Sequence, residues 1–259
     1  MQTGKVIDFI VDWLAEYCCS SGMNGFVVGI SGGIDSAVTS TLCAKTGKRV
    51  IALNMPIYQL EDQKSQALRH IDWLEQNYAR VEGVTIDLTP VFQALEDTYP
   101  LEIQDDLTMA NTRSRLRMTT LYAYATHNKM LVTGTGNKVE DFGVGFFTKY
   151  GDGGVDIAPI ADLLKSEVYD VGGCLDILPE ILYAKPTDGL WLDNRSDEEQ
   201  LGATYPELEW AMRFDNARQE ETHLSPRERQ VLALYRDLHR KNLHKIEPLP
   251  VARIPDELR

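Results

Sequence analysis

The segment Ser-Gly-Gly-Ile-Asp-Ser at residues 31–36 contains the residue types that bind phosphate. It follows a short apolar run and precedes a helical pattern, so it joins a strand to a helix. Gly32 and Gly33 can adopt backbone angles that other residues avoid, and free amides at a helix N-terminus attract anions. Asp35 would repel a phosphate unless a cation lay between them, which indicates Mg²⁺. The segment therefore predicts a phosphate-binding loop with an associated metal ion.

The hydroxyls of Ser31 and Ser36 suit the same purpose. The loop lacks the Gly-Lys-Ser/Thr ending of a Walker A loop, and it lacks the G-x-G-x-x-G of a dinucleotide fingerprint. A plainer interpretation is a glycine turn whose serine and aspartate cap a helix. We favour phosphate binding because all these features coincide directly after an apolar strand.

Strand and helix patterns alternate along the first half of the chain, which predicts a doubly wound α/β fold with a parallel sheet between helices. The predicted strands are 26–30, 49–55, 84–88 and 129–134. The predicted helices are 3–20, 35–45, 61–79, 90–95 and 107–127. Ligands bind such sheets at the carboxyl ends of the strands. The chemistry should therefore lie in the loops 31–36 and 134–140.

The alternation of strand and helix patterns ends after residue 140. Residues 141–160 are rich in glycine and have no helical period, so we expect a long functional loop with short extended pieces. Further helices are predicted over 162–171, 206–218 and 225–241, an irregular polar segment over 184–204 and an extended tail over 244–255. We expect one domain over residues 1–259, with a helical and extended C-terminal part from about residue 205.

Composition and charge narrow the class of protein. The 26 Lys and Arg residues against 39 Asp and Glu residues give a net charge of −13, which disfavours nucleic-acid partners. No stretch approaches the roughly 20 apolar residues of a membrane span. Asp8, Asp12 and Glu16 exclude the apolar core of a signal peptide. The four cysteines have no C-x-x-C spacing, so we expect free thiols in a cytoplasmic protein.

Several segments carry a family resemblance. The phosphate loop resembles that of the ATP pyrophosphatases, which split ATP into AMP and pyrophosphate while adenylating a substrate. Segments 111–125, 131–140, 146–172 and 185–202 resemble the NAD synthetase family, as does the His-Lys pair at 244–245. The run Thr-Lys-Tyr-Gly-Asp-Gly, followed by Asp-Ile-Ala-Pro-Ile, is the most specific part. The resemblance covers nearly the whole chain and implies a Rossmann-like fold of the adenine nucleotide alpha hydrolase type.

The resemblance implies that ATP, as co-substrate with Mg²⁺, adenylates the nicotinate carboxylate of nicotinic acid adenine dinucleotide (deamido-NAD). Ammonia then attacks the acyl-adenylate, giving NAD and AMP. Family members that use glutamine carry an additional N-terminal domain, whereas the phosphate loop here begins at residue 31. We therefore expect the ammonia-dependent form without a glutaminase domain. The family also implies a homodimer.

The resemblance carries site residues over to this chain. The implied Mg²⁺ ligands are Asp35 and Glu140. The implied ATP-binding residues are Gly29, Ser31, Gly32, Gly33, Asp35, Ser36, Asn54, Thr135, Lys165 and Thr187. The implied deamido-NAD-binding residues are Asn111, Arg115, Lys149, Asp156, His244 and Lys245. The implied catalytic residues are Lys165 and, at the nicotinate end where ammonium must be bound and deprotonated, Asp152 and Asp156.

Each of these residues also has a plainer interpretation. Glu140 and the aspartates could be solvated loop residues, Lys165 an exposed helix lysine and Thr187 a helix cap. The three arginines near the middle of the chain could be surface charges or intersubunit partners; they are Arg113, Arg115 and Arg117. Any one of the aromatic residues beside the loop could stack on the nicotinate ring or pack in the core; they are Phe146, Phe147 and Tyr150.

Two other functions remain open from the sequence. A tRNA-modifying ATP pyrophosphatase would need a basic surface and paired catalytic cysteines, which the charge of −13 and the cysteine spacing disfavour. A non-catalytic adenine-nucleotide sensor would not need Glu140, Lys165 and the 149–160 loop in addition to the phosphate loop.

Overall fold

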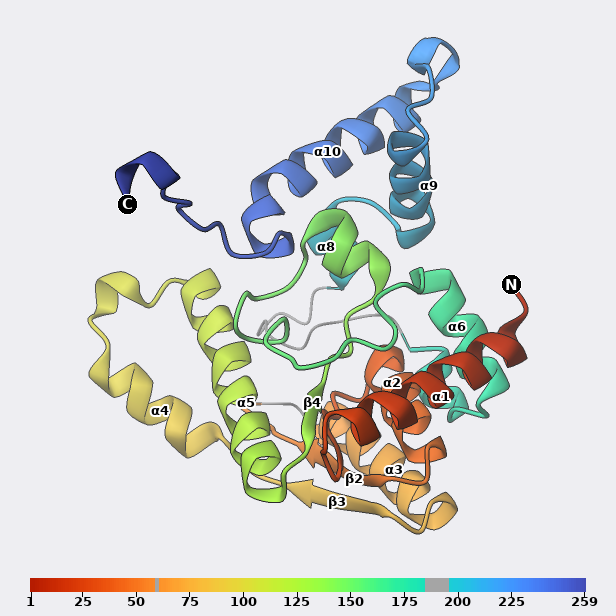
Figure 1. Cartoon of the computed structure of the whole chain (residues 1–259), viewed down its shortest axis with the longest axis vertical. Coiled ribbons are helices and arrows are strands. Elements are labelled where there is room, and N and C mark those ends of the chain that lie inside the picture. The colour runs from red at the N-terminus through yellow and green to blue at the C-terminus, as the bar shows by residue number, and fades with distance from the viewer. Residues whose placement is uncertain (59–60, 185–195) are drawn as a thin grey trace.

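The computed structural model describes residues 1–58, 61–184 and 196–259, with only the backbone described for 61–65 (Figure 1). Its centre is a parallel sheet in the order β3-β2-β1-β4. The strands are β1 (Gly25–Gly29), β2 (Arg49–Asn54), β3 (Val81–Thr85) and β4 (Leu131–Thr133). The strand order reverses beside β1, which is where ligands bind in doubly wound sheets. The predicted fold class is confirmed.

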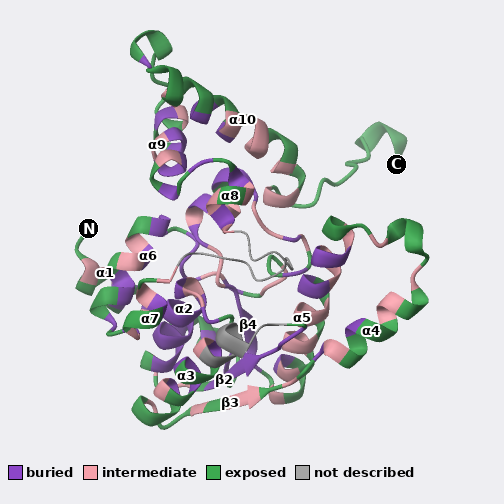
Figure 2. Ribbon diagram, turned by 180° about the vertical axis from the view of Figure 1, so that it is seen from behind, coloured by how far each residue is buried: buried purple, intermediate pink, exposed green. Residues whose placement is uncertain are grey.

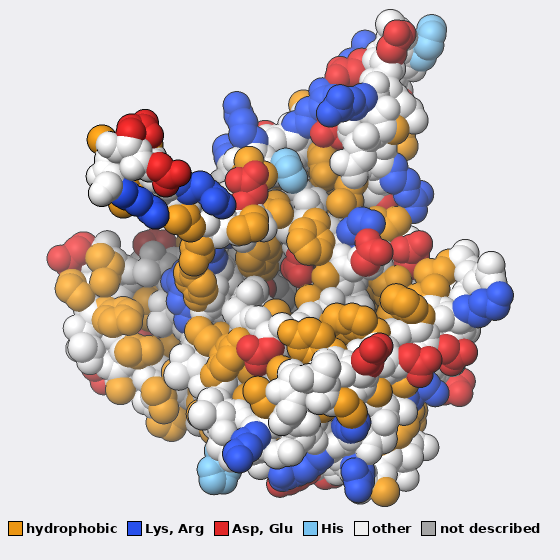
Figure 3. Space-filling model, viewed as in Figure 1, with side chains coloured by type: hydrophobic (Ala, Val, Ile, Leu, Met, Phe, Trp, Pro, Cys, Tyr) orange, Lys and Arg blue, Asp and Glu red, His pale blue; other side chains and the backbone are white. Residues whose placement is uncertain are grey.

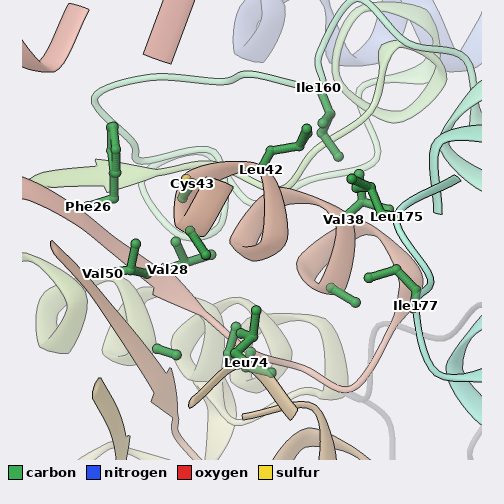
Figure 4. Packing of buried hydrophobic residues seen from close by; sticks show 14 of the residues in the cluster. Phe26, Val28, Val38, Leu42, Cys43, Val50, Leu74, Ile160, Leu175 and Ile177 are labelled. Carbon is green, nitrogen blue, oxygen red and sulfur yellow. The ribbon is translucent and has the colours of Figure 1, made fainter. Parts of the chain in front are cut away.

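Helices cover both faces of the sheet because its central strands are apolar on both sides. Phe26, Val28 and Val50 belong to the apolar cluster on one face, which Figure 4 shows in close view, whereas Val27 and Ile51 belong to the cluster on the other. The first face is covered by α1 (Thr3–Ser20), α2 (Ile34–Lys45), α3 (Glu61–Asn77) and α6 (Lys165–Cys174). The second is covered by α4 (Thr89–Thr98) and α5 (Asp106–Asn128). Figure 2 shows this buried centre.

A third apolar cluster lies in the C-terminal part, around Leu208, Leu232 and Tyr235. It joins the π-helix η2 (Val139–Val144) to α8 (Asp197–Leu201), α9 (Tyr205–Asn216) and α10 (Pro226–Ile246). The remaining short helices are η1 (Leu101–Ile103), α7 (Pro179–Leu182), η3 (Glu221–His223) and η4 (Asp256–Leu258). None of the described helices has the length and apolar character that crossing a bilayer requires.

The third strand begins and ends three residues earlier than the predicted 84–88. Gly83 explains the register, because a Cβ there would collide with the side chain of Ile71 in α3. The glycine lets α3 lie close to this edge of the sheet. Beyond the strand, the amides of Ile86 and Leu88 still donate to the carbonyls of Asn54, which ends β2, and of Pro56.

Three predictions for the second half were wrong. The expected loop from residue 141 begins as the helix η2, because the side-chain oxygen of Asn137 accepts hydrogen bonds from the amides of Val139 and Glu140 at its start. The expected extended tail over 244–255 starts only at residue 247, since α10 continues to Ile246. The first proline after 226 is Pro248, and a proline disfavours helix at the residue before it. The segment expected to be irregular over 184–204 contains α8, which the Ser196 side chain caps, and α7 was not predicted.

Candidate active site

The phosphate loop connects β1 to α2, as the sequence predicts. Gly32 has φ +89°, a backbone conformation that favours glycine. The Ser31 hydroxyl accepts a hydrogen bond from the Gly33 amide at 3.1 Å and lies 3.1 Å from the Ser36 hydroxyl. Gly33 is the N-cap of α2 and no side chain caps it. The start of the helix therefore keeps amides that a phosphate could use.

The Asp35 carboxylate pairs with Lys165, which also contacts Glu140. The Lys165 ammonium lies 2.5 Å from Asp35 Oδ2 and 3.2 Å from Glu140 Oε1. The exposed fractions of these side chains are 3% for Lys165, 19% for Asp35 and 15% for Glu140, so the triad is largely buried. The helix-capping interpretation of Asp35 does not hold, and neither does the interpretation of Lys165 as an exposed helix lysine.

Burial and the neighbouring charges have opposite effects on the pKa values of Asp35 and Lys165. Desolvation raises the pKa of Asp35 above its usual range, although the Lys165 ammonium opposes the rise. Burial alone would lower the pKa of Lys165, but Asp35 and Glu140 keep it above its ordinary value. Lys165 is therefore a protonated cation between two carboxyl groups that would otherwise repel each other.

The structure adds residues to the triad that the sequence did not reveal. Asn137 donates from Nδ2 to Asp35 Oδ1 at 3.2 Å. The hydroxyl of Tyr205 donates to Glu140 Oε1 at 2.5 Å and lies 3.3 Å from Asp197 Oδ2. Burial and the neighbouring carboxylates raise the pKa of Tyr205. Tyr205 is 65 residues from Glu140 in the chain, so no spacing rule could have found it.

Asp152 lies on the far side of the loop that follows η2, beside α5. Its Oδ1 accepts hydrogen bonds from the Ser114 hydroxyl at 2.6 Å and from the Thr148 amide at 3.0 Å. The Thr148 hydroxyl donates in turn to Asn111 Oδ1 at 2.7 Å. Although Asp152 is an exposed residue, the protein packed around its carboxyl raises the pKa, against the effect of these hydrogen bonds. Asn111 therefore supports the loop in this structure.

Asp141 is a further carboxylate of the site that the sequence did not reveal. Its oxygens lie against Gly136, where a Cβ would collide with them. Desolvation raises the pKa of Asp141 to about 8, with smaller contributions from Glu140 and Asp152. Carboxyl groups therefore gather along this part of the site.

Asp156, predicted at the nicotinate end, has hydrogen-bond partners on α5 and β4. Its Oδ1 accepts a hydrogen bond from the Tyr122 hydroxyl at 3.0 Å, and its Oδ2 accepts one from the Val132 amide at 2.8 Å. Both oxygens are thus engaged, and burial together with Asp156 raises the pKa of Tyr122 to about 12. These bonds anchor the end of the glycine-rich segment to β4.

The cationic residues predicted for the dinucleotide meet around the end of α10. Lys245 donates to the Phe147 carbonyl at 2.7 Å and lies 5.1 Å from the centre of the Phe147 ring. Lys149 donates to the carbonyl of His244, an exposed residue, and burial lowers the pKa of Lys245. Arg115 is exposed, and its Nε lies 3.4 Å from the Lys149 carbonyl.

The three clustered arginines separate in the structure. Arg113 is 9% exposed, with its guanidinium 4.6 Å from the centre of the Phe92 ring. Arg117 donates from Nε to the Met55 carbonyl at 3.1 Å. Only Arg115 is exposed and adjacent to the loop. The helix turns by about 200° between alternate positions, so alternate residues face different surroundings.

The remaining predicted ATP-binding residues lie at the same edge of the sheet. Gly29 ends β1, Thr135 follows β4 and Asn54 ends β2. Asn54 is 1% exposed, and its Nδ2 has no hydrogen-bond partner among the described residues. Thr187 lies outside the described residues. Figure 3 shows the surface hollowed between the C-terminal helices and the part of the chain that carries the sheet.

The donor set fits Mg²⁺ that shares its shell with a nucleotide. Within the described residues, no group of three or more His, Cys, Asp or Glu side chains could hold a metal ion. Asp35 and Glu140, however, converge on a single cation position, which the Lys165 ammonium takes here. Mg²⁺ commonly uses one or two carboxylates and completes its shell with phosphate oxygens and water.

Comparison with known proteins assigns the chain to a family. Residues 6–249 match the family model for NAD synthase. The NH(3)-dependent NAD(+) synthetase of Archaeoglobus fulgidus is 36% identical over 100% of both chains, and that of Methanosarcina mazei is 39% identical over 81% of this chain and 80% of the relative. A solved structure named NMN synthetase from Francisella tularensis has a TM-score of 0.84 and 33% identity, and it covers 99% of each chain. The chain belongs to the NAD synthase family.

Proposed function

We propose that the protein uses ATP and ammonia to convert nicotinic acid adenine dinucleotide into NAD, with an acyl-adenylate as intermediate and with AMP and pyrophosphate as products. The observation that carries this proposal is the buried triad of Asp35, Lys165 and Glu140 beside the phosphate loop. Family membership and the ammonia-dependent relatives support the same conclusion.

The first half-reaction brings a carboxylate to a phosphate, so cations must offset the repulsion. The amides at the start of α2 would bind phosphate oxygens, and Lys165 would move its ammonium onto them. Asp35 and Glu140 would then hold Mg²⁺, which neutralises phosphate charge and stabilises the leaving pyrophosphate. Tyr205 keeps Glu140 oriented through its hydrogen bond of 2.5 Å.

The second half-reaction needs ammonium close to the acyl-adenylate and a group that takes its proton. Asp152 is the candidate because Oδ1 is held by Ser114 and Thr148 while Oδ2 stays able to accept. The raised pKa of Asp152 suits a proton acceptor, since a base works best when its pKa is near the operating pH. Asp156 would act indirectly, by anchoring the end of the same loop to β4.

The cations around the end of α10 would bind the dinucleotide. Lys149, Lys245 and Arg115 lie around one stretch of backbone, at residues 147–149. A diphosphate needs such grouped positive charge in a protein of net charge −13. His244 neighbours them on the last turn of α10.

One assay tests the proposal. The purified protein is mixed with ATP, Mg²⁺, ammonium and nicotinic acid adenine dinucleotide, and NAD and pyrophosphate are measured. We expect the two products in equal amounts. Folded protein that binds ATP but forms no NAD would contradict the proposal. Replacing ammonium by glutamine should give no NAD, and NAD formed from glutamine by this protein would contradict ammonia dependence.

The relative named NMN synthetase supplies a second candidate substrate. The same assay with nicotinic acid mononucleotide compares kcat/KM for the two acids. We expect the dinucleotide to be preferred, because the relatives of higher identity are named NAD(+) synthetases. A higher kcat/KM for the mononucleotide would reassign the substrate and leave the chemistry of amidation unchanged.

We also propose that the enzyme is a single domain and works as a homodimer in the cytoplasm. Large apolar side chains are exposed along α4, η1 and the start of α5, at Val91 (49%), Leu101 (86%), Ile103 (44%) and Leu107 (59%). A second copy would cover such a patch. Light scattering should give twice the chain mass, and Leu101→Glu with Leu107→Glu should reduce it to a monomer.

A further inference from the structure

The helix α10 holds the end of η2 through side-chain hydrogen bonds to its backbone. His239 donates from Nδ1 to the Gly143 carbonyl at 2.7 Å, and Asn242 donates from Nδ2 to the Val144 carbonyl at 2.8 Å. Residues three apart lie on one face of a helix, so both side chains reach the same segment. The last carbonyls of a helix have no partner within it, and these two receive theirs from α10.

The contact continues into the loop after η2. Gly145 has φ +65°, and a Cβ there would collide with Asn242 Cβ, so α10 lies directly against this turn. One turn further along α10, Lys245 donates to the Phe147 carbonyl at 2.7 Å. The helix therefore fixes the backbone over residues 143–147.

The other side of the loop is held by α5. Asn111 accepts from the Thr148 hydroxyl, and Ser114 donates to the Asp152 carboxylate at 2.6 Å. Both helices therefore contact the loop, α5 mainly at Thr148 and Asp152, and α10 mainly at the backbone carbonyls of residues 143, 144 and 147. The turn at Gly145 lies between the metal-ligand candidate of η2 and the acid of the loop.

We propose that His239 and Asn242 are positioning residues for the reaction. By holding the turn at Gly145, they set Asp152 at the correct distance from Glu140, so that ammonia meets the adenylated substrate. The proposal rests on the proposed function. Small displacements of reacting groups cost large factors in rate, so two carbonyl contacts can matter to turnover.

The fold of α10 does not depend on these two side chains. Val231, Leu232 and Tyr235 bury the helix in the third apolar cluster, where Leu208 and Phe214 of α9 also lie. Removing one donor should therefore free a carbonyl and loosen the turn without undocking the helix. A positioning role therefore predicts a loosened turn on a docked helix, whereas a purely structural role predicts that the helix itself undocks.

The experiment compares two replacements of His239. An Asn side chain can still donate near the position of Nδ1, whereas Leu cannot donate. His239→Leu should lower kcat/KM for ammonium and for the acid dinucleotide by about tenfold or more, with KM for ATP within about twofold of wild type. His239→Asn should recover most of the loss, and Asn242→Leu should repeat the effect of His239→Leu. Arg240→Leu, an exposed neighbour on α10, is the matched control and should leave all constants unchanged.

Hydrogen exchange of the backbone amides over residues 145–152 gives a reading that does not need the reaction. We expect exchange about tenfold faster in His239→Leu and Asn242→Leu, and unchanged in Arg240→Leu. Unchanged exchange, or equal losses with His239→Leu and His239→Asn, would overturn the positioning role. A fall in ATP binding as large as that in ammonium use would also overturn it. A wild-type protein that forms no NAD refutes the proposed function, while the exchange data still decide whether α10 holds the loop.

Discussion

Replacing Lys165 by Met removes the only described cation between Asp35 and Glu140 while keeping an apolar chain of similar length. At 2.5 Å and 3.2 Å, the two attractions are about 7 and 5 kcal/mol at an effective dielectric constant of about 20. Most of this is offset by the cost of burying the charges, and removing one partner of a buried pair typically costs about 3–5 kcal/mol. We therefore expect a loss of about 4 kcal/mol in the free energy of unfolding.

The same variant should gain a response to Mg²⁺ in the absence of ATP. In wild type the two carboxylates are paired with Lys165, whereas in the variant they would be free to bind the metal ion. With Mg²⁺ at about 100 times its dissociation constant, binding restores about 2.7 kcal/mol. At about 2–4 °C per kcal/mol, Lys165→Met should melt about 10 °C below wild type without Mg²⁺ and regain more than half of that with it.

Thermal unfolding with and without Mg²⁺ measures both effects. The melting temperature of wild type should change by less than about 1 °C when Mg²⁺ is added alone, because the free energy needed to displace Lys165 would offset the free energy of binding the metal ion. Lys138→Met is the matched control, since its partner Asp162 is 95% exposed and such a surface pair contributes about 0–1 kcal/mol. A Lys165→Met protein that melts like wild type, or that ignores Mg²⁺, would refute the reasoning about the triad.

Three further predictions concern other residues. Asp35→Asn should reduce NAD formation at least about a hundredfold while acid-dinucleotide binding by calorimetry changes little, and retention of a tenth of the activity would exclude its metal role. Arg115→Ala should raise KM for the acid dinucleotide about tenfold before that for ATP, and an effect on ATP alone would refute its assignment. The pKa of buried His70 is lowered to about 4, mainly by desolvation, so the unfolded chain takes up the proton first as pH falls. The contribution of neutral His70 to the free energy of unfolding should be fully present above about pH 6.5 and fall by about 3 kcal/mol toward pH 4. Urea unfolding should show this pH dependence in wild type and lose it in His70→Leu.

The sheet and the loops at its carboxyl edge could be predicted because both follow from local pattern. Strands buried on two faces are continuously apolar, and parallel strands bring their carboxyl ends together. Asp35 and Glu140, in loops after β1 and β4, were therefore expected at one edge, and the structure places them around one ammonium. The strand and helix pattern was enough to bring these two loops to one edge, whereas the choice of Glu140 as a metal ligand came from the family resemblance.

The parts that the sequence could not predict depend on packing between distant elements. Tyr205 contacts Glu140 only because α9 packs on η2 in the third apolar cluster. The end of α10 was predicted too early because the proline-rich segment 244–255 indicated an extended tail, and residues 242–246 have no strong apolar period. Their contacts with the loop therefore had no signature in the sequence.

Carboxyl groups and cations are unevenly distributed over the site. Carboxyl groups gather at the end where ammonium would act, with Asp141 and Asp152 both raised in pKa by desolvation. The cations Lys149 and Lys245 lie next to α10, where they donate to the carbonyls of His244 and Phe147. Under the proposed function, a substrate with a diphosphate at one end and an acyl group at the other would place its diphosphate at these cations. The net charge of −13 disfavours long nucleic acids, but it does not prevent this pairing, because the few cations lie where an anionic ligand would meet them.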